Sequence, residues 1–146
     1  MVYPASGIIF KINTAGRATP GTFVVIKDVE SFEPTFSNKV ESWTPFDTEG
    51  WERNLTTGKG IKIAIKGKRN EGDPGNDYVA DKTMDIGEDA NSILEMTFPN
   101  GDKLTVPCVV DTKSIGGGKS TEVSQLESDF VSDGKPTYVP HTVPLG

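Results

Sequence analysis

The sequence GGGKST, residues 116–121, combines three glycines, a lysine and two hydroxyl side chains, which are residue types that can hold nucleotide phosphates. A phosphate-binding loop of this type also needs a glycine five positions before the glycine that precedes the lysine, and that position holds Lys113. The loop must also open a helix, whose free N–H groups bind the phosphate. Val123, Leu126 and Phe130 have helical spacing, so a following helix stays open. The incomplete motif favours a turn between two β-elements that binds no nucleotide.

The chain has one cysteine, Cys108, and one histidine, His141. Nucleophilic catalysis would need the two side chains within hydrogen-bond reach, together with a group that orients the base. Cys108 falls on the apolar face of an expected strand, where a free cysteine is typically a buried core residue. One cysteine and one histidine do not make a usual zinc ligand set, and one cysteine excludes an internal disulfide. We expect a protein that is not an enzyme, with no metal and no cofactor.

Carboxylates gather between residues 71 and 81. Their spacing does not match the calcium loop of an EF-hand. Sugar hydrolysis would need two of them about 5–10 Å apart across a cleft, and the sequence indicates no cleft. We interpret the segment as a solvated acidic loop that leads into a short helix within residues 76–89, capped by Asn76 or Asp77.

The composition indicates one domain over residues 1–146, with 34% hydrophobic and 25% charged residues. The 16 glycines and 10 prolines favour a turn-rich β structure. A net charge of −6 argues against tight binding to nucleic acid, because that binding depends on clustered Lys and Arg. It suits a surface that DNA passes without sticking. The N-terminus does not resemble a signal peptide, and no apolar run approaches the roughly 20 residues of a membrane span.

Several segments have the sequence patterns of β-strands. Residues 22–30 are rich in β-branched side chains, and residues 59–69 alternate isoleucine with lysine. Segments 92–98 and 103–111 form an expected hairpin around an Asn-Gly turn. Pro107 should place the second of these strands at a sheet edge or at a bulge, because proline has no N–H to donate.

The remaining segments complete the expected fold. Residues 122–132 fit either a helix or a strand, and a strand would direct Leu126 and Phe130 inward. Residues 1–21 and 135–146 are irregular and form expected arms. With six or seven strands, the fold class is mainly β: a β-sandwich or barrel with one short α-helix, a long inserted hairpin loop over 31–57, and extended N- and C-terminal arms.

The long segment 31–57 holds five of the twelve aromatic residues of the chain and shows no clean periodicity. Aromatic side chains anchor protein interfaces, so this loop is an expected subunit interface. The basic segment 59–69 directly precedes an acidic one, 71–89. It is either the solvated face of an amphipathic strand or a contact between identical subunits joined head to tail. The expected interface residues are Phe32, Phe36, Trp43, Phe46, Trp51, Lys119 and Tyr138.

Residues 30–137 resemble the major tail (tail tube) proteins of long-tailed bacteriophages. Each motif that carries the resemblance is weak alone, and their order and spacing together are specific. The motifs are the aromatic loop W-x-P-x-D-x-x-G-W at Trp43–Trp51, T-G-K at Thr57–Lys59, the run Gly67–Ala80, F-P-N-G at Phe98–Gly101, the glycines Gly116–Gly118, and D-G-K-P at Asp133–Pro136.

The resemblance implies a structural subunit of the non-contractile, siphophage type. Such subunits form hexameric rings that stack into a tube, through which DNA passes without specific binding. Implied partners are other copies of the chain, a tape measure protein, a tail tip or baseplate, and a tail terminator. The implied location is the virion, after assembly in the bacterial cytoplasm and with no membrane contact. We expect carboxylates, rather than the lysines of 59–69, to dominate the lumen.

Two alternatives remain. A monomeric carbohydrate-binding module would use Trp43 and Trp51 as a stacking platform. A tail terminator would form single rings that do not polymerise.

Overall fold

The computed structural model describes residues 2–141 of the chain. Within this range the structure has eight strands and one α-helix, together with four short 3₁₀ turns at Ala5–Gly7, Phe46–Thr48, Lys82–Met84 and Gly87–Ala90. The regular elements are β1 (Ile9–Asn13), β2 (Phe23–Val25), β3 (Val29–Trp43), β4 (Arg53–Lys68), α1 (Pro74–Asp81), β5 (Asn91–Thr97), β6 (Lys103–Ser114), β7 (Gln125–Ser132) and β8 (Thr137–Val139).

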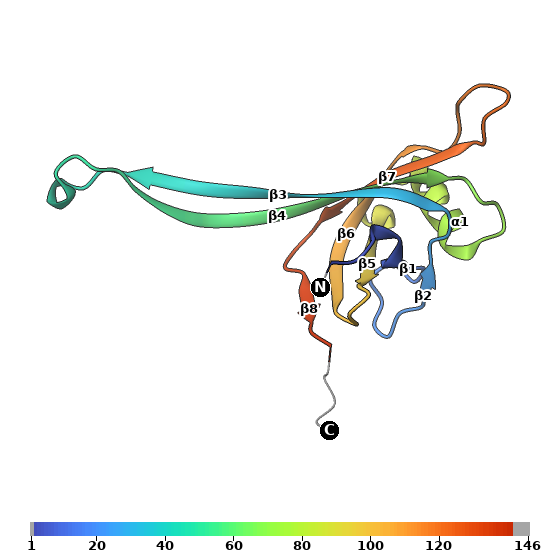
Figure 1. Cartoon of the computed structure of the whole chain (residues 1–146), viewed down its shortest axis with the longest axis horizontal. Helices are drawn as coiled ribbons and strands as arrows, with labels where there is room; N and C mark the ends of the chain where they lie inside the picture. The colour runs from blue at the N-terminus through green and yellow to red at the C-terminus, as the bar shows by residue number, and fades with distance from the viewer. Residues whose placement is uncertain (1, 142–146) are drawn as a thin grey trace.

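All eight strands belong to one antiparallel sheet in the order β2-β1-β5-β6-β7-β4-β3, and β8 pairs with β6 off this path. Figure 1 shows a body in which the sheet curls around the core, and a long β3–β4 ribbon that extends far beyond it. The expected mainly β class with one helix is confirmed, although the sheet does not close into a barrel. The eight strands exceed the expected six or seven because β1 and β8 join the sheet from the terminal segments.

The core lies on one face of the sheet, because alternate residues of each strand point the same way. Ile61, Ile63 and Ile65 are buried together, as their spacing predicts. Leu126 and Phe130 also face this core, which shows that the ambiguous segment is the strand β7. The other members of the core come from β1, the β2–β3 connection, α1, β5 and β6: Phe10, Ile12, Ile26, Val79, Ala80, Leu94, Met96, Val106, Cys108 and Val110.

Pro107 lies in an interior strand, so the expectation of an edge or a bulge at this residue is wrong. It faces Ile93 of β5 in regular register. The carbonyl of Pro107 accepts a hydrogen bond from the Asp133 N–H, at 2.8 Å, on the opposite side of β6. The missing N–H therefore points to the gap in which β7 has ended at Ser132 and β8 has not yet begun. A proline fits here because no neighbouring strand needs a backbone N–H from this residue.

Helix α1 begins earlier and is shorter than the expected segment 76–89. Its N-cap is Asp73, whose carboxylate accepts the Asn76 N–H at 3.0 Å, and Pro74 occupies the first turn. The expected caps, Asn76 and Asp77, lie inside the helix instead. Proline at the first helical position has the right φ and needs no partner for its nitrogen, so the helix starts there.

The terminal segments are partly built into the sheet. The chain joins the sheet at Ile9, inside the expected arm 1–21, and β1 lies between β2 and β5. At the other end, β8 places residues 137–139 of the expected arm 135–146 against β6. Residues 142–146 of that arm lie outside the described range. The expected strand 22–30 is divided into β2 and the start of β3 by Asp28, which has a φ of 63°.

Candidate functional site

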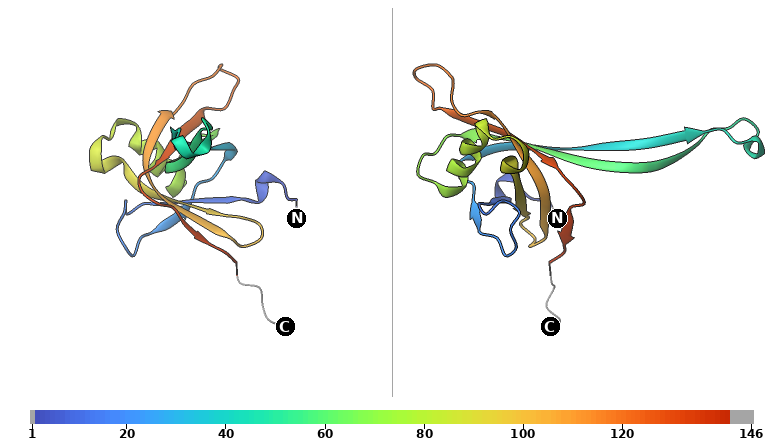
Figure 2. Two further views of the ribbon diagram at one scale, coloured as in Figure 1. Left: turned by 90° about the vertical axis from the view of Figure 1, so that its left-hand side faces the viewer. Right: turned by 180° about the vertical axis from the view of Figure 1, so that it is seen from behind.

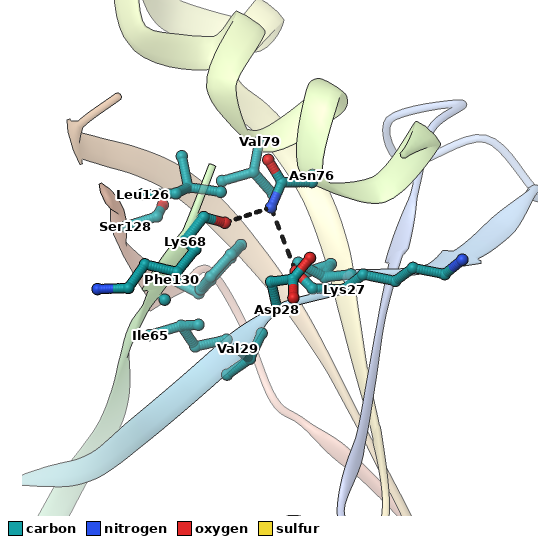
Figure 3. Close-up of a pocket in the computed structure, with 12 residues that line it drawn as sticks. Lys27, Asp28, Val29, Ile65, Lys68, Asn76, Val79, Leu126, Ser128 and Phe130 are labelled. Carbon is teal, nitrogen blue, oxygen red and sulfur yellow. Dashed lines mark hydrogen bonds between the residues drawn. The ribbon is translucent and has the colours of Figure 1, made fainter. Parts of the chain in front are cut away.

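The cavity beneath α1 is too small to hold a substrate. Its volume is about 10 Å³, which is about the space for one water molecule. Figure 3 shows Asn76 at this place, donating hydrogen bonds to the Lys68 and Lys27 carbonyls, while Ser128 and Phe130 line the other side. The candidate site lies instead on the exposed ribbon formed by β3 and β4.

The β3–β4 ribbon is the largest unpartnered feature of the described chain. From Lys62 onward, β4 also pairs with β7 and belongs to the body. Between Arg53 and Ile61 it pairs with β3 alone, against Phe36–Trp43. The ribbon thus runs seven residues beyond Phe36, or about 24 Å at about 3.4 Å per residue. A two-stranded hairpin alone in water is marginally stable, so a ribbon of this length gains stability when it is covered by a partner.

The tip of the ribbon gathers three of the expected interface aromatics. Phe46 is fully exposed and Trp51 is 77% exposed, while Trp43 is partly exposed and has the Arg53 guanidinium over its ring, 5.5 Å from the ring centre. The turn is fixed by local structure: Glu49 has a φ of 55°, and Gly50 follows with a φ of 86°. Exposed aromatics gathered in this way mark a contact site.

The other expected interface residues lie elsewhere. Phe36 is exposed where the ribbon leaves the body. Phe32 is half buried and packs edge-on against Phe10, 5.2 Å between ring centres, so it supports the core of its own chain. Lys119 lies in the β6–β7 loop, at the end of the molecule opposite the tip (Figure 1), and its N–H donates to the Glu122 carboxylate at 3.2 Å.

The loop around GGGKST connects β6 directly to β7, so the segment that follows the motif is not a helix. Gly117 and Gly118 have φ values of 122° and 111°. Glycine adopts this conformation readily, and the glycines therefore serve the turn. The sequence-based interpretation of a connector between two strands agrees with this geometry.

Two further exposed apolar residues of the ribbon are not among the expected interface residues: Val40 on β3 and Leu55 on β4, which are 51% and 60% exposed. A strand register would have revealed them, because Val40 faces Thr56 and Leu55 faces Glu41. The segment 31–57 shows no clean period because the ribbon has solvent on both faces. The signal of alternating burial is therefore absent from it.

Tyr138, the last expected interface residue, is held by Asp102 in the β5–β6 turn. The Tyr138 hydroxyl donates to one carboxylate oxygen. The other oxygen accepts the His141 N–H at 2.8 Å and lies 2.6 Å from the His141 ring Nδ1. Asn100 also donates to Asp102, at 3.1 Å. The bonds from Tyr138 and then from His141 hold the pKa of Asp102 well below its ordinary value. This carboxylate fixes the C-terminal strand onto the body.

Replacement of Asp102 by alanine is expected to release residues 137–141. Hydrogen exchange followed by mass spectrometry should show faster exchange in this segment and unchanged exchange in β6. Because the pKa of Asp102 is lowered in the folded chain, the stabilisation is present above its usual pKa of about 4. It is lost as the pH falls below that value. Asp111→Ala is the control, since Asp111 pairs with Lys113 on an exposed surface; equal exchange in the two variants would contradict the assignment.

Cys108 is fully buried in the core, as its strand position predicts. Burial raises the pKa of its thiol to about 12, so the reactive thiolate is scarce at neutral pH. We expect no labelling by iodoacetamide in the native protein at pH 8 and complete labelling in denaturant. A Met84→Cys variant, at an 88% exposed position, should react at once; rapid labelling of the parent chain would show that the core is open.

The open antiparallel sheet, with one helix against its core and a long ribbon at one side, is a fold shared with chains of known structure. A chain of the tail of an empty gene transfer agent particle, refined with C6 symmetry, matches with a TM-score of 0.72 and 14% identity, over 94% of this chain and 99% of that chain. A chain of a native gene transfer agent virion matches with a TM-score of 0.71 and 14% identity, over the same shares of the two chains.

A third match is a chain of the sheath–tube complex of an extracellular contractile injection system, PVC, in the extended state. Its TM-score is 0.64 with 10% identity, over 96% of this chain and 93% of that chain. No protein-family model and no curated protein sequence matches this chain, so the likeness rests on three-dimensional structure.

The comparisons confirm the resemblance to tail tube proteins at the level of the fold. The similar chains belong to a tail, to a virion and to a sheath–tube complex. In residues 2–141, no helix has the length and apolar character needed to cross a membrane.

Proposed function

We propose that this protein is the structural subunit of a phage tail tube, which assembles with copies of itself in the virion. The observation that carries the proposal is the ribbon with its exposed aromatic tip, on a fold shared with chains of assembled tails. A ribbon without a core of its own and a row of exposed apolar side chains are costly in a monomer and useful in an interface.

The two free edges of the sheet support the proposal that the subunits form rings. The outer edge of β3 has no strand partner in the described chain over its whole length, Val29–Trp43, and β2 ends the sheet on the other side. A long free edge invites pairing with another chain. Pairing of different edges is a heterologous contact, which closes into a ring when the rotation permits. We propose six subunits per ring, as the C6 symmetry of one similar tail suggests.

The lumen is proposed to carry little positive charge, so that DNA slides through it. Two of the four lysines of 59–69 are matched by carboxylates: Lys62 lies 3.3 Å from Asp129, and Lys68 lies 3.1 Å from Glu30. With the net charge of −6, this pairing leaves carboxylates to set the field that phosphates meet. A tube structure whose lumen is lined mainly by Lys and Arg would contradict this part.

The proposal includes the partners of such a tube: a tape measure protein inside it, a tip or baseplate at one end and a terminator at the other. It also includes a siphophage-type tail, in which the tube works without a contractile sheath. These points depend on the resemblance of the sequence to tail tube proteins of long-tailed phages.

Electron microscopy of the purified protein at high concentration, with size-exclusion chromatography, tests the proposal. Hollow tubes or stacked six-fold rings would support it, and single rings that never stack would indicate a terminator. If the protein stays monomeric, addition of isolated tail tips should nucleate tubes. A monomer that ignores tail tips and binds saccharides through the tryptophans would overturn the proposal.

A further inference from the structure

A groove lies beside the base of the ribbon, where β4 passes the turn between β7 and β8. Phe36, Ile61 and Pro136 supply its apolar lining, and Lys59 and Lys135 supply its charge. The groove has a volume of about 480 Å³, which falls within the range of about 300–1,000 Å³ of ligand pockets.

The charges of the groove have no partner in the described part of the chain. Neither Lys59 nor Lys135 takes part in an ion pair there, whereas Lys62 and Lys68 of β4 do. The tip of the ribbon shows the opposite pattern. Asp47, Glu49 and Glu52 have no ion pair in residues 2–141, and Arg53 is occupied by the Trp43 ring. The tip is aromatic and acidic, whereas the groove is apolar and basic.

The tip does not reach the groove of its own chain. The strands pair without a break in direction from Phe36 opposite Ile61 to Trp43 opposite Arg53, with one register shift after Lys39. This pairing holds the tip about 24 Å from Phe36, at about 3.4 Å per residue. Figure 2 shows the ribbon projecting straight from the body in the view from behind. The complementary surfaces therefore meet only between two copies.

We propose that the aromatic, acidic tip of one copy docks in the Lys59–Lys135 groove of another copy. The inference rests on the proposed tube function and deepens it, because it names the partner surface of the ribbon. Phe46 and Trp51 enter the apolar part, and Asp47 and Glu52 approach the two lysines. Each copy gives one tip and receives one, so the contact is heterologous and propagates along a filament.

Charge reversal tests the pairing. The double variants Asp47→Lys/Glu52→Lys and Lys59→Glu/Lys135→Glu each place like charges on the tip and on the groove. Like charges that face each other across an interface strongly oppose association. Each variant alone should fail to polymerise while it elutes as a folded monomer. A mixture of the two should form tubes again, because each tip then meets a groove of opposite charge. Tubes from either variant alone, or none from the mixture while the parent chain assembles, would overturn the inference.

A disulfide trap tests the geometry. Cys108 is buried, so only the introduced cysteines are expected to form a cross-link between chains. A Thr44→Cys chain mixed with a Pro136→Cys chain should form a covalent dimer on a non-reducing gel, whereas Thr44→Cys with Met84→Cys should not. Tubes that form without the cross-link between Thr44→Cys and Pro136→Cys would contradict the proposed docking site and would leave the proposed tube function standing. A parent chain that forms no tubes with tail tips would remove the tube function itself.

Discussion

Replacement of Trp43 and Trp51 by alanine is expected to abolish tube growth and to leave a folded monomer. Both side chains lie at the tip of the ribbon, away from the core, and Trp51 is 77% exposed. Truncation of an aromatic interface anchor costs about 2 kcal/mol or more. Two anchors per contact then weaken association by about a thousandfold, since 1.4 kcal/mol is a factor of ten.

Negative-stain microscopy over a series of concentrations measures this effect as the lowest concentration that yields tubes. The free energy of unfolding should stay within about 0.5 kcal/mol of that of the parent chain, as is usual for substitutions of exposed side chains that support no core packing or cap. Met84→Ala/Ile86→Ala is the matched control, because these side chains are 88% and 84% exposed and belong to the body. Unaltered tubes from the tryptophan variant would refute the interface role of the tip.

The sequence predicts the buried strand faces and the tight turns better than it predicts which strands lie side by side. Alternation marks Ile61, Ile63 and Ile65 as one buried face, and the Asn-Gly turn marks the β5–β6 hairpin, because core burial and turn chemistry are local signals. Sequence patterns place Pro107 at an edge or at a bulge, since they do not show that β7 and β8 share one side of β6. A gap of this kind arises only in the tertiary structure.

The candidate site is predicted in part for the same reason. The density of aromatics marks residues 31–57 as an interface, and the structure brings Trp43, Phe46 and Trp51 together at one tip. It also places Phe32 against the core, which composition alone does not separate from the exposed aromatics. The basic groove joins residues of β3, β4 and the turn before β8, and no spacing in the sequence brings Lys59 close to Lys135.

Asn76 shows how one buried side chain holds the helix to the sheet. Its side-chain amide donates to the carbonyls of Lys27, at 3.2 Å, and Lys68, at 2.9 Å (Figure 3). Its oxygen accepts the Asn70 N–H at 3.0 Å and the Arg69 guanidinium at 2.8 Å. The residue is fully buried, and these four bonds join α1 to the end of β4, to the two residues that follow it and to the β2–β3 connection.

Asn76→Ala is therefore expected to destabilise the monomer by about 3–4 kcal/mol, because each buried polar group left without a partner costs about 1–3 kcal/mol. The midpoint of thermal unfolding should fall by roughly 10 °C, at about 2–4 °C per kcal/mol for a chain of this size. Asn76→Asp keeps the acceptor and loses both donors, so it should also destabilise the protein, with Asn38→Ala on the exposed ribbon as a neutral control. Because the tip is untouched, Asn76→Ala should still form tubes at low temperature. A midpoint equal to that of Asn38→Ala would show that packing alone holds the helix.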